Sequence, residues 1–341
     1  MTRLGEGPFA ALERFPRAAM GHLPTPLEAM ANLGRDLGLS LFVKRDDCTG
    51  VGFGGNKIRQ LEYYLGDAQL AGADVLLITG AVQSNFVRAA AAMGCRLGMA
   101  CHIQLEERVP DISALHRTNG NMLLNNLLGA TLHSYPEGED EAGADAAIAS
   151  IAGELREKGH TPYIIPLGAT SKPLGALGYV RAAMEVLPQI EAAGGIDEII
   201  VASGSALTHA GLLLGLRLAG DMTPVRGICV RRDAEGQTAR VLKRVADTAA
   251  LMGVDSPVTV DDVRVSDVAL GPGYGRMTAG TRAAIMRTAR AEGLFLDPVY
   301  TGKVMAGLIA LAEADELCGS RILFWHTGGQ PALFGYGDQF V

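Results

Sequence analysis

Short hydrophobic runs rich in β-branched residues alternate with longer amphipathic segments along most of the chain. The short runs predict strands at residues 41–45, 75–79, 99–105, 163–165, 198–202, 225–230 and 322–325. The longer segments predict helices, among them residues 58–70, 85–97, 144–158, 210–218 and 279–292. In the first of these helices, Ile58, Leu61, Leu65 and Ala68 recur at helical spacing and predict one buried face.

This alternation indicates an α/β fold with a largely parallel sheet that helices cover on both faces. A further helix start is predicted at Thr25-Pro26-Leu27-Glu28, which has the hydroxyl, proline and glutamate of a capping box. Residues 137–143 carry four acidic side chains and predict an exposed surface turn. The length of 341 residues suggests one large domain or two of medium size.

Composition and charge narrow the possible partners. The formal net charge is −7, from 37 acidic and 30 basic residues, and aromatic residues make up only 5% of the chain. We therefore expect no nucleic-acid partner, and the hydrophobic runs are too short to cross a membrane. The five cysteines form no C-x-x-C pair and no signal-peptide pattern opens the sequence, so we expect a cytoplasmic protein.

Glycines cluster at four strand-to-helix turns, the places where α/β proteins bind their ligands. The clusters are residues 50–57, 203–211, 271–275 and 326–329. Glycine in such a turn lets the backbone come close to a ligand. Each cluster alone has an alternative interpretation as a tight turn, but the four together indicate a binding site.

The first cluster contains a G-x-G-x-x-G pattern at Gly50, Gly52 and Gly55, after a strand and before a helix, as in dinucleotide-binding folds. That pattern also needs an acidic residue at the end of the next strand, and here residues 75–79 are followed by glycine and alanine. The P-loop pattern fails too, because Asn56 separates Gly55 from Lys57. A dinucleotide-dependent oxidoreductase is therefore only a secondary alternative.

Lys57 is the candidate chemical residue of this turn. It stands in the first turn of the predicted helix, where the helix dipole disfavours a cation, so helix stability does not explain it. A site that lowers the pKa of this amine would make it a nucleophile toward an aldehyde. The alternative interpretation is an ordinary exposed lysine.

The second cluster predicts a phosphate site. Residues 203–208 follow an apolar strand and precede a helix, so backbone N–H groups and the hydroxyls of Ser205 and Thr208 would surround a dianion at the helix N-terminus. A lysine that captures an aldehyde and a separate phosphate cup together match pyridoxal 5'-phosphate, which carries both groups.

Eight motifs occur along the chain in the same order as in a known enzyme family. They are Lys44-Arg-Asp-Asp47, Gly54-Gly-Asn-Lys57, Gln83-Ser-Asn85, Gly120-Asn121, Ser203-Gly-Ser205 with Thr208-His-Ala-Gly211, Gly271-Pro-Gly-Tyr-Gly275, Asp297-Pro-Val-Tyr-Thr-Gly-Lys303 and His326-Thr-Gly-Gly329. From about Phe15 to Phe334 the chain resembles the fold-type II pyridoxal phosphate enzymes, in the group of D-cysteine desulfhydrase and 1-aminocyclopropane-1-carboxylate deaminase.

The resemblance implies a tryptophan synthase β-like fold, with two open, twisted, mostly parallel sheets flanked by helices. It implies a large cofactor-binding domain of residues 1–52 and 164–341 and a small domain of residues 53–163. It also implies a homodimer.

The resemblance further assigns site residues. Lys57 would hold the cofactor covalently and later move the α-proton of the substrate. Asn85 would bind the phenolic oxygen of the cofactor. Ser84 would bind the substrate carboxylate or help to position the lysine. The remaining expected contacts are Ser203, Gly204, Ser205, Ala206, Leu207 and Thr208 to the phosphate, Thr327 to the pyridine nitrogen, and Asn85, Phe86, Tyr274 and Tyr300 to the substrate. The alternatives are core tyrosines and a threonine that caps a turn.

The implied reaction is α,β-elimination from a small β-substituted amino acid. D-Cysteine desulfhydrase activity, which gives pyruvate, sulfide and ammonia, is the first expectation. L-Cysteate sulfo-lyase and 1-aminocyclopropane-1-carboxylate deaminase activities follow it, and a catalytically silent ligand-binding relative is a further alternative.

Two positions depart from the family pattern. Phe86 follows the serine–asparagine pair where a polar His or Gln is common, which changes the pocket. Thr301 stands where the deaminases carry Glu, which argues against deaminase activity. Lys172 lies in a segment that the family uses near the substrate, and is either a cation for an anionic leaving group or an exposed loop lysine.

Histidines predict no metal site. His209 and His326 lie within the motifs, and we expect structural hydrogen bonds for both. The others show no H-x-x-x-H spacing, so no metal ligand set is expected.

Overall fold

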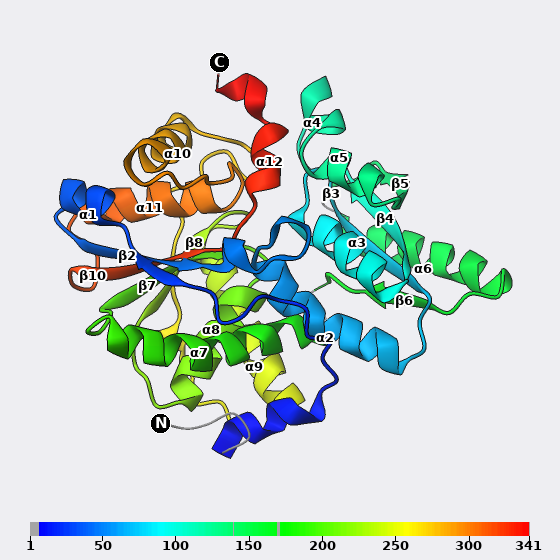
Figure 1. Ribbon diagram of the computed structural model, residues 1–341, viewed down its shortest axis with the longest axis horizontal. Coiled ribbons are helices and arrows are strands. Elements are labelled where there is room, and N and C mark those ends of the chain that lie inside the picture. The colour runs from blue at the N-terminus through cyan, green and yellow to red at the C-terminus, as the bar shows by residue number, and fades with distance from the viewer. Residues whose placement is uncertain (1–6, 139, 169–170, 341) are drawn as a thin grey trace.

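Two mostly parallel β-sheets organise the chain (Figure 1). The computed structural model describes residues 7–138, 140–168 and 171–340. The larger sheet has the order β1(Leu27–Ala29)-β2(Ser40–Arg45)-β10(Arg321–His326)-β7(Glu198–Ser203)-β8(Val225–Cys229)-β9(Arg264–Ser266). The smaller sheet has the order β5(Thr131–Tyr135)-β4(Ala100–Glu106)-β3(Val75–Ala81)-β6(Pro162–Ile165). Among the described residues, β1 and β2 form the one antiparallel pair.

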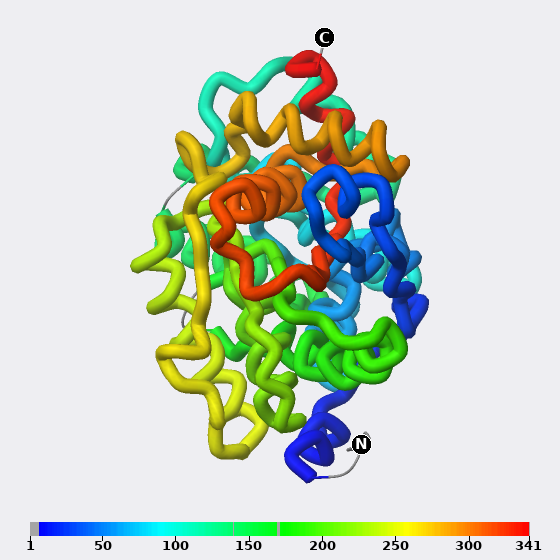
Figure 2. Tube along the Cα trace, turned by 90° about the vertical axis from the view of Figure 1, so that its left-hand side faces the viewer, coloured from blue at the N-terminus to red at the C-terminus, as the bar shows by residue number. Residues whose placement is uncertain are grey.

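Helices cover both sheets. The α-helices are α1(Ala31–Leu37), α2(Asn56–Leu70), α3(Asn85–Leu97), α4(Ala114–Thr118), α5(Asn121–Leu127), α6(Glu141–Glu157), α7(Leu174–Ala192), α8(Leu207–Leu218), α9(Ala234–Met252), α10(Ala279–Glu292), α11(Thr301–Glu313) and α12(Gln330–Phe334). Short 3-10 helices are η1(Gly7–Arg14), η2(Asp46–Cys48), η3(Val51–Phe53), η4(Val260–Asp262) and η5(Gly337–Gln339). In both views η1 and η5 lie at opposite ends of the molecule (Figures 1 and 2).

Alternating side chains of β3 show how the small sheet is covered. Leu76 and Ile78 join the hydrophobic cluster that contains α3, whereas Val75 and Leu77 join a separate cluster with α6. Successive strand residues point to opposite faces, so α3 and α6 cover opposite faces of this sheet. Around the large sheet, α1, α10 and α11 lie on one side and α7, α8 and α9 on the other (Figure 1).

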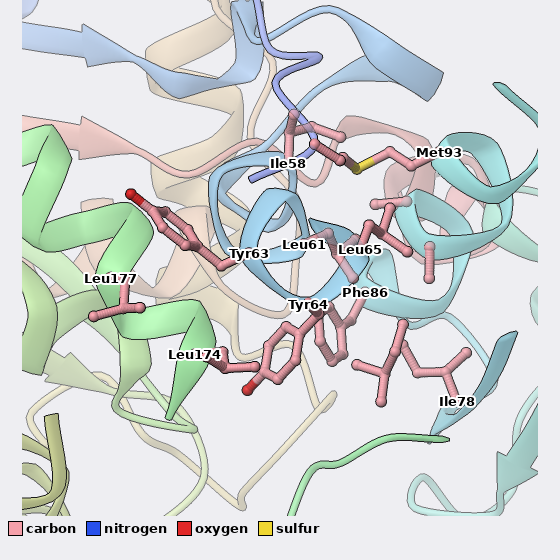
Figure 3. Close-up of a cluster of buried hydrophobic side chains, with 14 of the residues drawn as sticks. Ile58, Leu61, Tyr63, Tyr64, Leu65, Ile78, Phe86, Met93, Leu174 and Leu177 are labelled. Atoms are coloured by element: carbon pink, nitrogen blue, oxygen red, sulfur yellow. The ribbon is translucent and has the colours of Figure 1, made fainter. Parts of the chain in front are cut away.

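Helix α2 packs between α3 and α7 (Figure 3). The predicted stripe of Ile58, Leu61, Leu65 and Ala68 is fully buried there. The contact with α7 is close, because a side chain at Gly178 would collide with the carbonyl of Arg59. Residues 58–66 are all buried, so α2 is enclosed on all sides and not on one face as expected.

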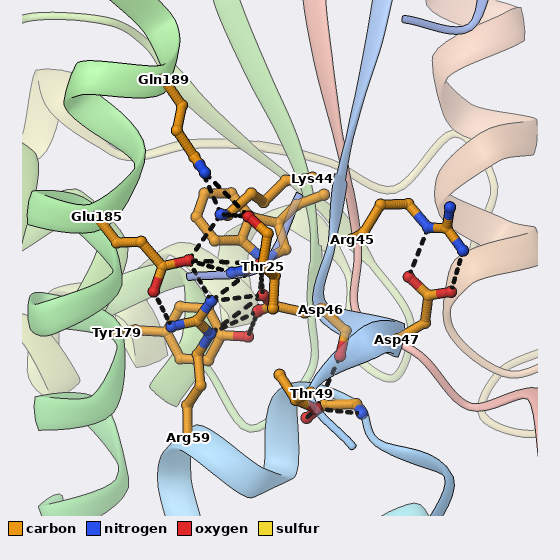
Figure 4. A network of polar contacts seen from close by, with 12 residues as sticks. Thr25, Lys44, Arg45, Asp46, Asp47, Thr49, Arg59, Tyr179, Glu185 and Gln189 are labelled. Carbon is orange, nitrogen blue, oxygen red and sulfur yellow. Dashed lines mark hydrogen bonds and ion pairs between the residues drawn. The ribbon is translucent and has the colours of Figure 1, made fainter. Parts of the chain in front are cut away.

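A buried network of polar groups joins α2 to the large sheet and to α7 (Figure 4). The Arg59 guanidinium donates to Asp46 at 2.8 Å and to both carboxylate oxygens of Glu185 at 2.8 Å. Lys44 donates to Glu185 at 2.7 Å. Although burial alone raises carboxyl pKa values, the charge of Arg59 holds the pKa of Asp46 and of Glu185 below the ordinary value.

Most predicted elements are confirmed, but the capping box at Thr25 is wrong. Residues 27–29 form the edge strand β1, and the Thr25 hydroxyl instead donates to Asp46 at 3.0 Å. The Thr25 hydroxyl therefore belongs to the buried polar network and does not cap a helix. The short elements β1, β5 and β9 were not predicted.

The expected surface turn overlaps a helix of the structure, and the two expected domain seams fall within a strand and a 3-10 helix. The stretch predicted as a turn at 137–143 contains the start of α6, whose first residue Glu141 follows an Asp140 cap; residue 139 lies outside the described residues. The predicted domain seam at 163/164 falls inside strand β6, and the division into domains stays a prediction. The other predicted seam, at 52/53, falls within η3.

Replacing Arg59 by Met should lower the free energy of unfolding by about 3–5 kcal/mol, because the fully buried Asp46 loses its ion pair and Glu185 keeps only Lys44 as a counter-charge. Denaturant unfolding at neutral pH measures this loss.

The wild-type protein should also lose stability as the pH falls through the acid range, since Arg59 lowers the carboxyl pKa values in the folded state. The Arg59→Met variant should show less of this pH dependence.

The matched control is Lys243→Met, which breaks the exposed ion pair with Asp247 and should change stability by at most about 1 kcal/mol. Equal losses for the two variants would contradict a special role for the buried network.

Candidate active site

Loops that follow strands of both sheets line one cavity with an inner and an outer part. The outer part is lined by Lys57, Ser84, Asn85, Phe86, Tyr274 and Tyr300, among others. The inner part is lined by Lys57, Asn85, Ser205, Ala206, Thr208 and Thr327, among others. The predicted site residues from five separate segments are thus brought together around Lys57.

Lys57 lies in the first turn of α2, as predicted. Gly55, with φ of 109°, allows the preceding turn to approach the segment after β10, where the Asn56 N–H donates to the Thr327 carbonyl at 2.9 Å. The Lys57 amine lies 5.3 Å from the centre of the Phe86 ring and 3.3 Å from the Gln60 side-chain oxygen. Burial lowers the pKa of Lys57 to about 8, which is the shift expected of a nucleophilic amine.

Asn85 begins α3 directly after Ser84, whose hydroxyl caps the helix by accepting the Phe86 N–H at 3.2 Å. The side-chain oxygen of Asn85 accepts a hydrogen bond from Asn121 at 2.8 Å. This contact occupies the acceptor of the amide and leaves its N–H groups available in the cavity. Asn121 therefore orients Asn85 as a donor, which is what a phenolic oxygen requires.

The turn before α8 has the features of a phosphate cup. Ala206 has φ of 73° and the helix begins at Leu207, so the first N–H groups of α8 have no carbonyl partner within the helix. The Thr208 hydroxyl oxygen accepts hydrogen bonds from the amides of Asn56 and Gln60, both at 2.9 Å. Its own proton is then directed to another acceptor, because both lone pairs are used.

These residues fit pyridoxal phosphate. The helix N-terminus and the Thr208 hydroxyl suit a phosphate, the partly neutral Lys57 suits an aldehyde, and the Asn85 amide suits a phenolic oxygen. Thr327 lines the same inner cavity and offers a neutral hydroxyl. Each functional group of the cofactor therefore has a chemical partner in this cavity.

Ser203 does not face the cavity. It is fully buried, and its hydroxyl contacts the imidazole of His209 at 3.1 Å and the amide of Gln237 at 2.8 Å. His209 in turn contacts the Val225 carbonyl at 3.1 Å. The Ser203 hydroxyl and His209 thus support the turn from beneath, and the Ser203 hydroxyl is not directed to the phosphate cup.

His326 is also structural, as expected. Its ring nitrogens contact the Phe295 carbonyl at 3.2 Å and the Gly328 N–H at 3.1 Å. The described residues contain no group of three or more His, Cys, Asp or Glu side chains suited to a metal ion. In the same part of the chain no helix is long and apolar enough to cross a membrane.

The two predicted tyrosines form a pair in the outer cavity. The hydroxyls of Tyr274 and Tyr300 lie 2.8 Å apart, and their rings meet edge to face. Burial raises the pKa of both, so both hydroxyls are protonated at neutral pH. The charge of the Arg108 guanidinium offsets part of this increase in the pKa of Tyr274. The pair can therefore donate a proton to a group in the cavity.

Cations line the cavity at positions that the sequence pattern did not indicate. Arg108, Arg231, Arg232 and Arg240 belong to the outer wall, whereas Lys172 is exposed and is not among the lining residues. Arg108 pairs with Glu106 through two hydrogen bonds of 2.8 and 2.9 Å. Residues 169–170 of the loop before Lys172 lie outside the described residues. The expected role of Lys172 near the substrate is therefore not supported.

Other residues of the site also escaped the sequence analysis. Gln60 follows Lys57 by three residues on α2, so helical spacing would have placed both on one face. Asn121 lies in a recognised motif, but its contact with Asn85 spans 36 positions and has no local signal. Arg108 follows β4, Arg231 and Arg232 follow β8, and Arg240 lies on α9, so no local spacing relates all four arginines.

Comparisons with known proteins agree with this site. Residues 18–328 match the sequence profile of the pyridoxal-phosphate dependent enzyme family. D-Cysteine desulfhydrase of Salmonella typhi is 40% identical over 330 residues, which are 96% of this chain and 98% of the relative. The crystal structure of an ACC deaminase homologue has a TM-score of 0.87 at 38% identity and covers 98% of both chains.

A more distant structure shares the fold. The processed form of threonine deaminase isoform 2 from Solanum lycopersicum has a TM-score of 0.63 at 17% identity, over 94% of this chain and 88% of the other. The expected architecture of two mostly parallel sheets flanked by helices is thus confirmed.

Replacing Phe86 by Gln should raise the pH at which the cofactor-free protein captures pyridoxal phosphate. Only the neutral amine attacks an aldehyde, so the capture rate of the wild-type protein should rise with pH around a midpoint near 8. A polar side chain beside Lys57 admits water and weakens desolvation, which should move this midpoint up by about 1 pH unit. Visible absorbance of the bound cofactor measures the rate.

Phe86→Leu is the control, because it keeps the site apolar and should leave the midpoint in place. If Phe86→Gln also left it in place, Phe86 would not be a cause of the lowered pKa.

Proposed function

The chain belongs to the pyridoxal-phosphate dependent enzymes, and we propose that it is a D-cysteine desulfhydrase that converts D-cysteine to pyruvate, sulfide and ammonia. The observation that carries the proposal is the half-buried Lys57 amine, with its pKa near 8, in a cavity shared with a phosphate cup and a tyrosine pair. The relative from Salmonella typhi supports D-cysteine as the substrate.

The site residues divide into a holding set and a reacting set. Lys57, Asn85, Thr208, Thr327 and the first turn of α8 would hold pyridoxal phosphate. When bound, this cofactor supplies an aldehyde for the amine and an electron sink for the carbon that loses its proton.

Lys57 is suited to move the proton at the substrate Cα, because a pKa near 8 lets the amine accept and return a proton near neutral pH. Ser84 lines the cavity at the start of α3, where the helix N-terminus favours the substrate carboxylate. The Tyr274–Tyr300 pair, which lines the same cavity, would protonate the departing sulfur. Elimination of sulfide from D-cysteine, followed by hydrolysis, then yields pyruvate and ammonia.

Loaded with pyridoxal phosphate, the protein should release pyruvate and sulfide in equal amounts from D-cysteine, and more slowly from L-cysteine. Lys57→Ala should abolish this release, because both cofactor attachment and proton movement at Cα are lost. Borohydride reduction followed by peptide mass spectrometry should find the cofactor on the peptide that contains Lys57.

Lys172→Ala is the matched control and should keep full activity, since this lysine is exposed and outside the cavity. Full turnover by the Lys57→Ala variant would refute the mechanism. Absence of pyruvate release from a panel of D- and L-amino acids, with the cofactor still attached to Lys57, would instead indicate a catalytically silent relative.

The arginines of the outer cavity favour a second candidate substrate, L-cysteate, whose β-substituent is an anion. Arg231 and Arg232 both approach a single oxygen of Glu141, at 3.6 Å each. Burial, with a further contribution from Arg232, lowers the pKa of Arg240 to about 10. An anionic group in the outer cavity would relieve this repulsion between like charges.

Arg240→Gln should therefore raise the KM for L-cysteate about tenfold or more, which corresponds to the loss of one charge-assisted hydrogen bond. The KM for D-cysteine should change much less, because its side chain carries no fixed charge. Pyruvate release from both substrates measures the difference. Equal effects on the two substrates, or no release of sulfite from L-cysteate, would leave D-cysteine as the substrate.

We also propose a cytoplasmic homodimer. All five cysteines are free thiols, and Cys48 and Cys95 are exposed, which suits a reducing compartment. On α5 the side chains of Leu123 and Leu127 are 44% and 74% exposed, which supports a partner surface there.

A further inference from the structure

Lys303 is a fully buried cation for which the site as described has no role. It stands in the first turn of α11, where the helix dipole disfavours a positive charge. Its amine donates to the carbonyls of Leu270 at 2.7 Å and Gly273 at 2.6 Å. No carboxylate is among its partners in the described part of the chain, and burial lowers its pKa to about 8. Neither helix stability nor ion pairing therefore explains this lysine.

Both carbonyls belong to the loop that carries Tyr274. Gly273 directly precedes this tyrosine, and the carbonyl of Gly275, directly after it, accepts a hydrogen bond from the Tyr336 hydroxyl at 2.8 Å. The loop is rich in glycine and has few side chains of its own to pack. External donors on both sides of Tyr274 thus hold its backbone in place.

The same turn of α11 also places Tyr300. The Asp297 carboxylate accepts hydrogen bonds from the N–H groups of Val299, Tyr300 and Thr301 at 2.8–3.0 Å. Tyr300 is therefore fixed at the start of the helix, and Lys303 follows three residues later. One helical turn controls both tyrosines, whose hydroxyls meet at 2.8 Å in the cavity.

We propose that Lys303 is a positioning residue, whose ammonium group binds the 270–275 loop to the first turn of α11 and so keeps the Tyr274 hydroxyl on Tyr300. Lys303 is not among the residues that line the cavity, so it acts through Tyr274 and not on the substrate. The proposal rests on the proposed function at one point, because it takes the tyrosine pair as the proton donor to the leaving group.

A double-mutant cycle in the holoenzyme tests this proposal with D-cysteine, or with whichever substrate of the panel is turned over. Lys303→Met removes the charge and the donors at similar volume, and should lower kcat about 10- to 100-fold with little change in KM. In a Tyr274→Phe background the same substitution should lower kcat less than about twofold, because the hydroxyl it positions is already gone. Lys303→Arg, which keeps a cationic donor, should recover part of the lost activity.

Tyr336→Phe is a milder variant in case Lys303→Met does not fold. It removes the hydroxyl on the other side of the loop, and its smaller loss of kcat should also vanish in the Tyr274→Phe background. Lys243→Met, an exposed lysine far from the loop in sequence, serves as the control and should leave kcat unchanged.

Hydrogen exchange gives a readout that needs no activity. Amides of residues 268–277 should exchange faster in Lys303→Met than in the wild-type holoenzyme, whereas those of α2 should be unchanged. If no substrate is turned over but exchange changes in this way, the proposed function fails and the loop attachment stands. The proposal would be overturned by any of three results: unchanged exchange of these amides, a wild-type kcat in folded Lys303→Met, or an equal loss of kcat in the wild-type and Tyr274→Phe backgrounds.

Discussion

The buried ion pair between Arg59 and Asp46 holds helix α2, and this helix carries the reacting lysine, Lys57. Arg59 follows Lys57 by two residues, so the interaction that places one side chain also places the other. Asp46 further accepts hydrogen bonds from Tyr179 of α7 at 2.5 Å and from Trp325 of β10 at 2.8 Å. One carboxylate therefore connects the helix that carries the lysine to the large sheet and to its covering helix.

A second constraint is the use of buried cations to hold loops. Arg88 on α3 donates to the carbonyls of Gly52 and Gly54, in the glycine-rich turn before Lys57. Lys303 on α11 does the same for the loop of Tyr274. Carbonyl acceptors compensate part of the desolvation of these cations, and burial lowers the pKa of each. Lys57 has one longer contact of 3.3 Å to the Gln60 side-chain oxygen, and desolvation likewise lowers its pKa, which is the chemical property that the site uses.

Much of this was accessible from the residues alone. The hydrophobic periodicity predicted the longer strands and the helices α2, α3, α6, α8 and α10, because burial of one face imposes a repeat on consecutive residues. The family pattern located Lys57, Asn85 and the tyrosine pair, which the structure brings into one cavity. The capping box at Thr25 was wrong because β1 has only three residues and the Thr25 hydroxyl bonds to Asp46, 21 positions away.

The sequence by itself determined the alternation of elements, the glycine-rich turns and the presence of a lysine at the wrong end of a helix for stability, since each is a property of neighbouring residues. Only the tertiary structure decided which cations face the cavity, which way Asn85 points and what Lys303 holds. Arg108 follows β4 of the small sheet and Arg240 lies on α9, which covers the large sheet, and Asn121 lies 36 positions from Asn85. Such contacts depend on how distant segments pack, and no local spacing records them.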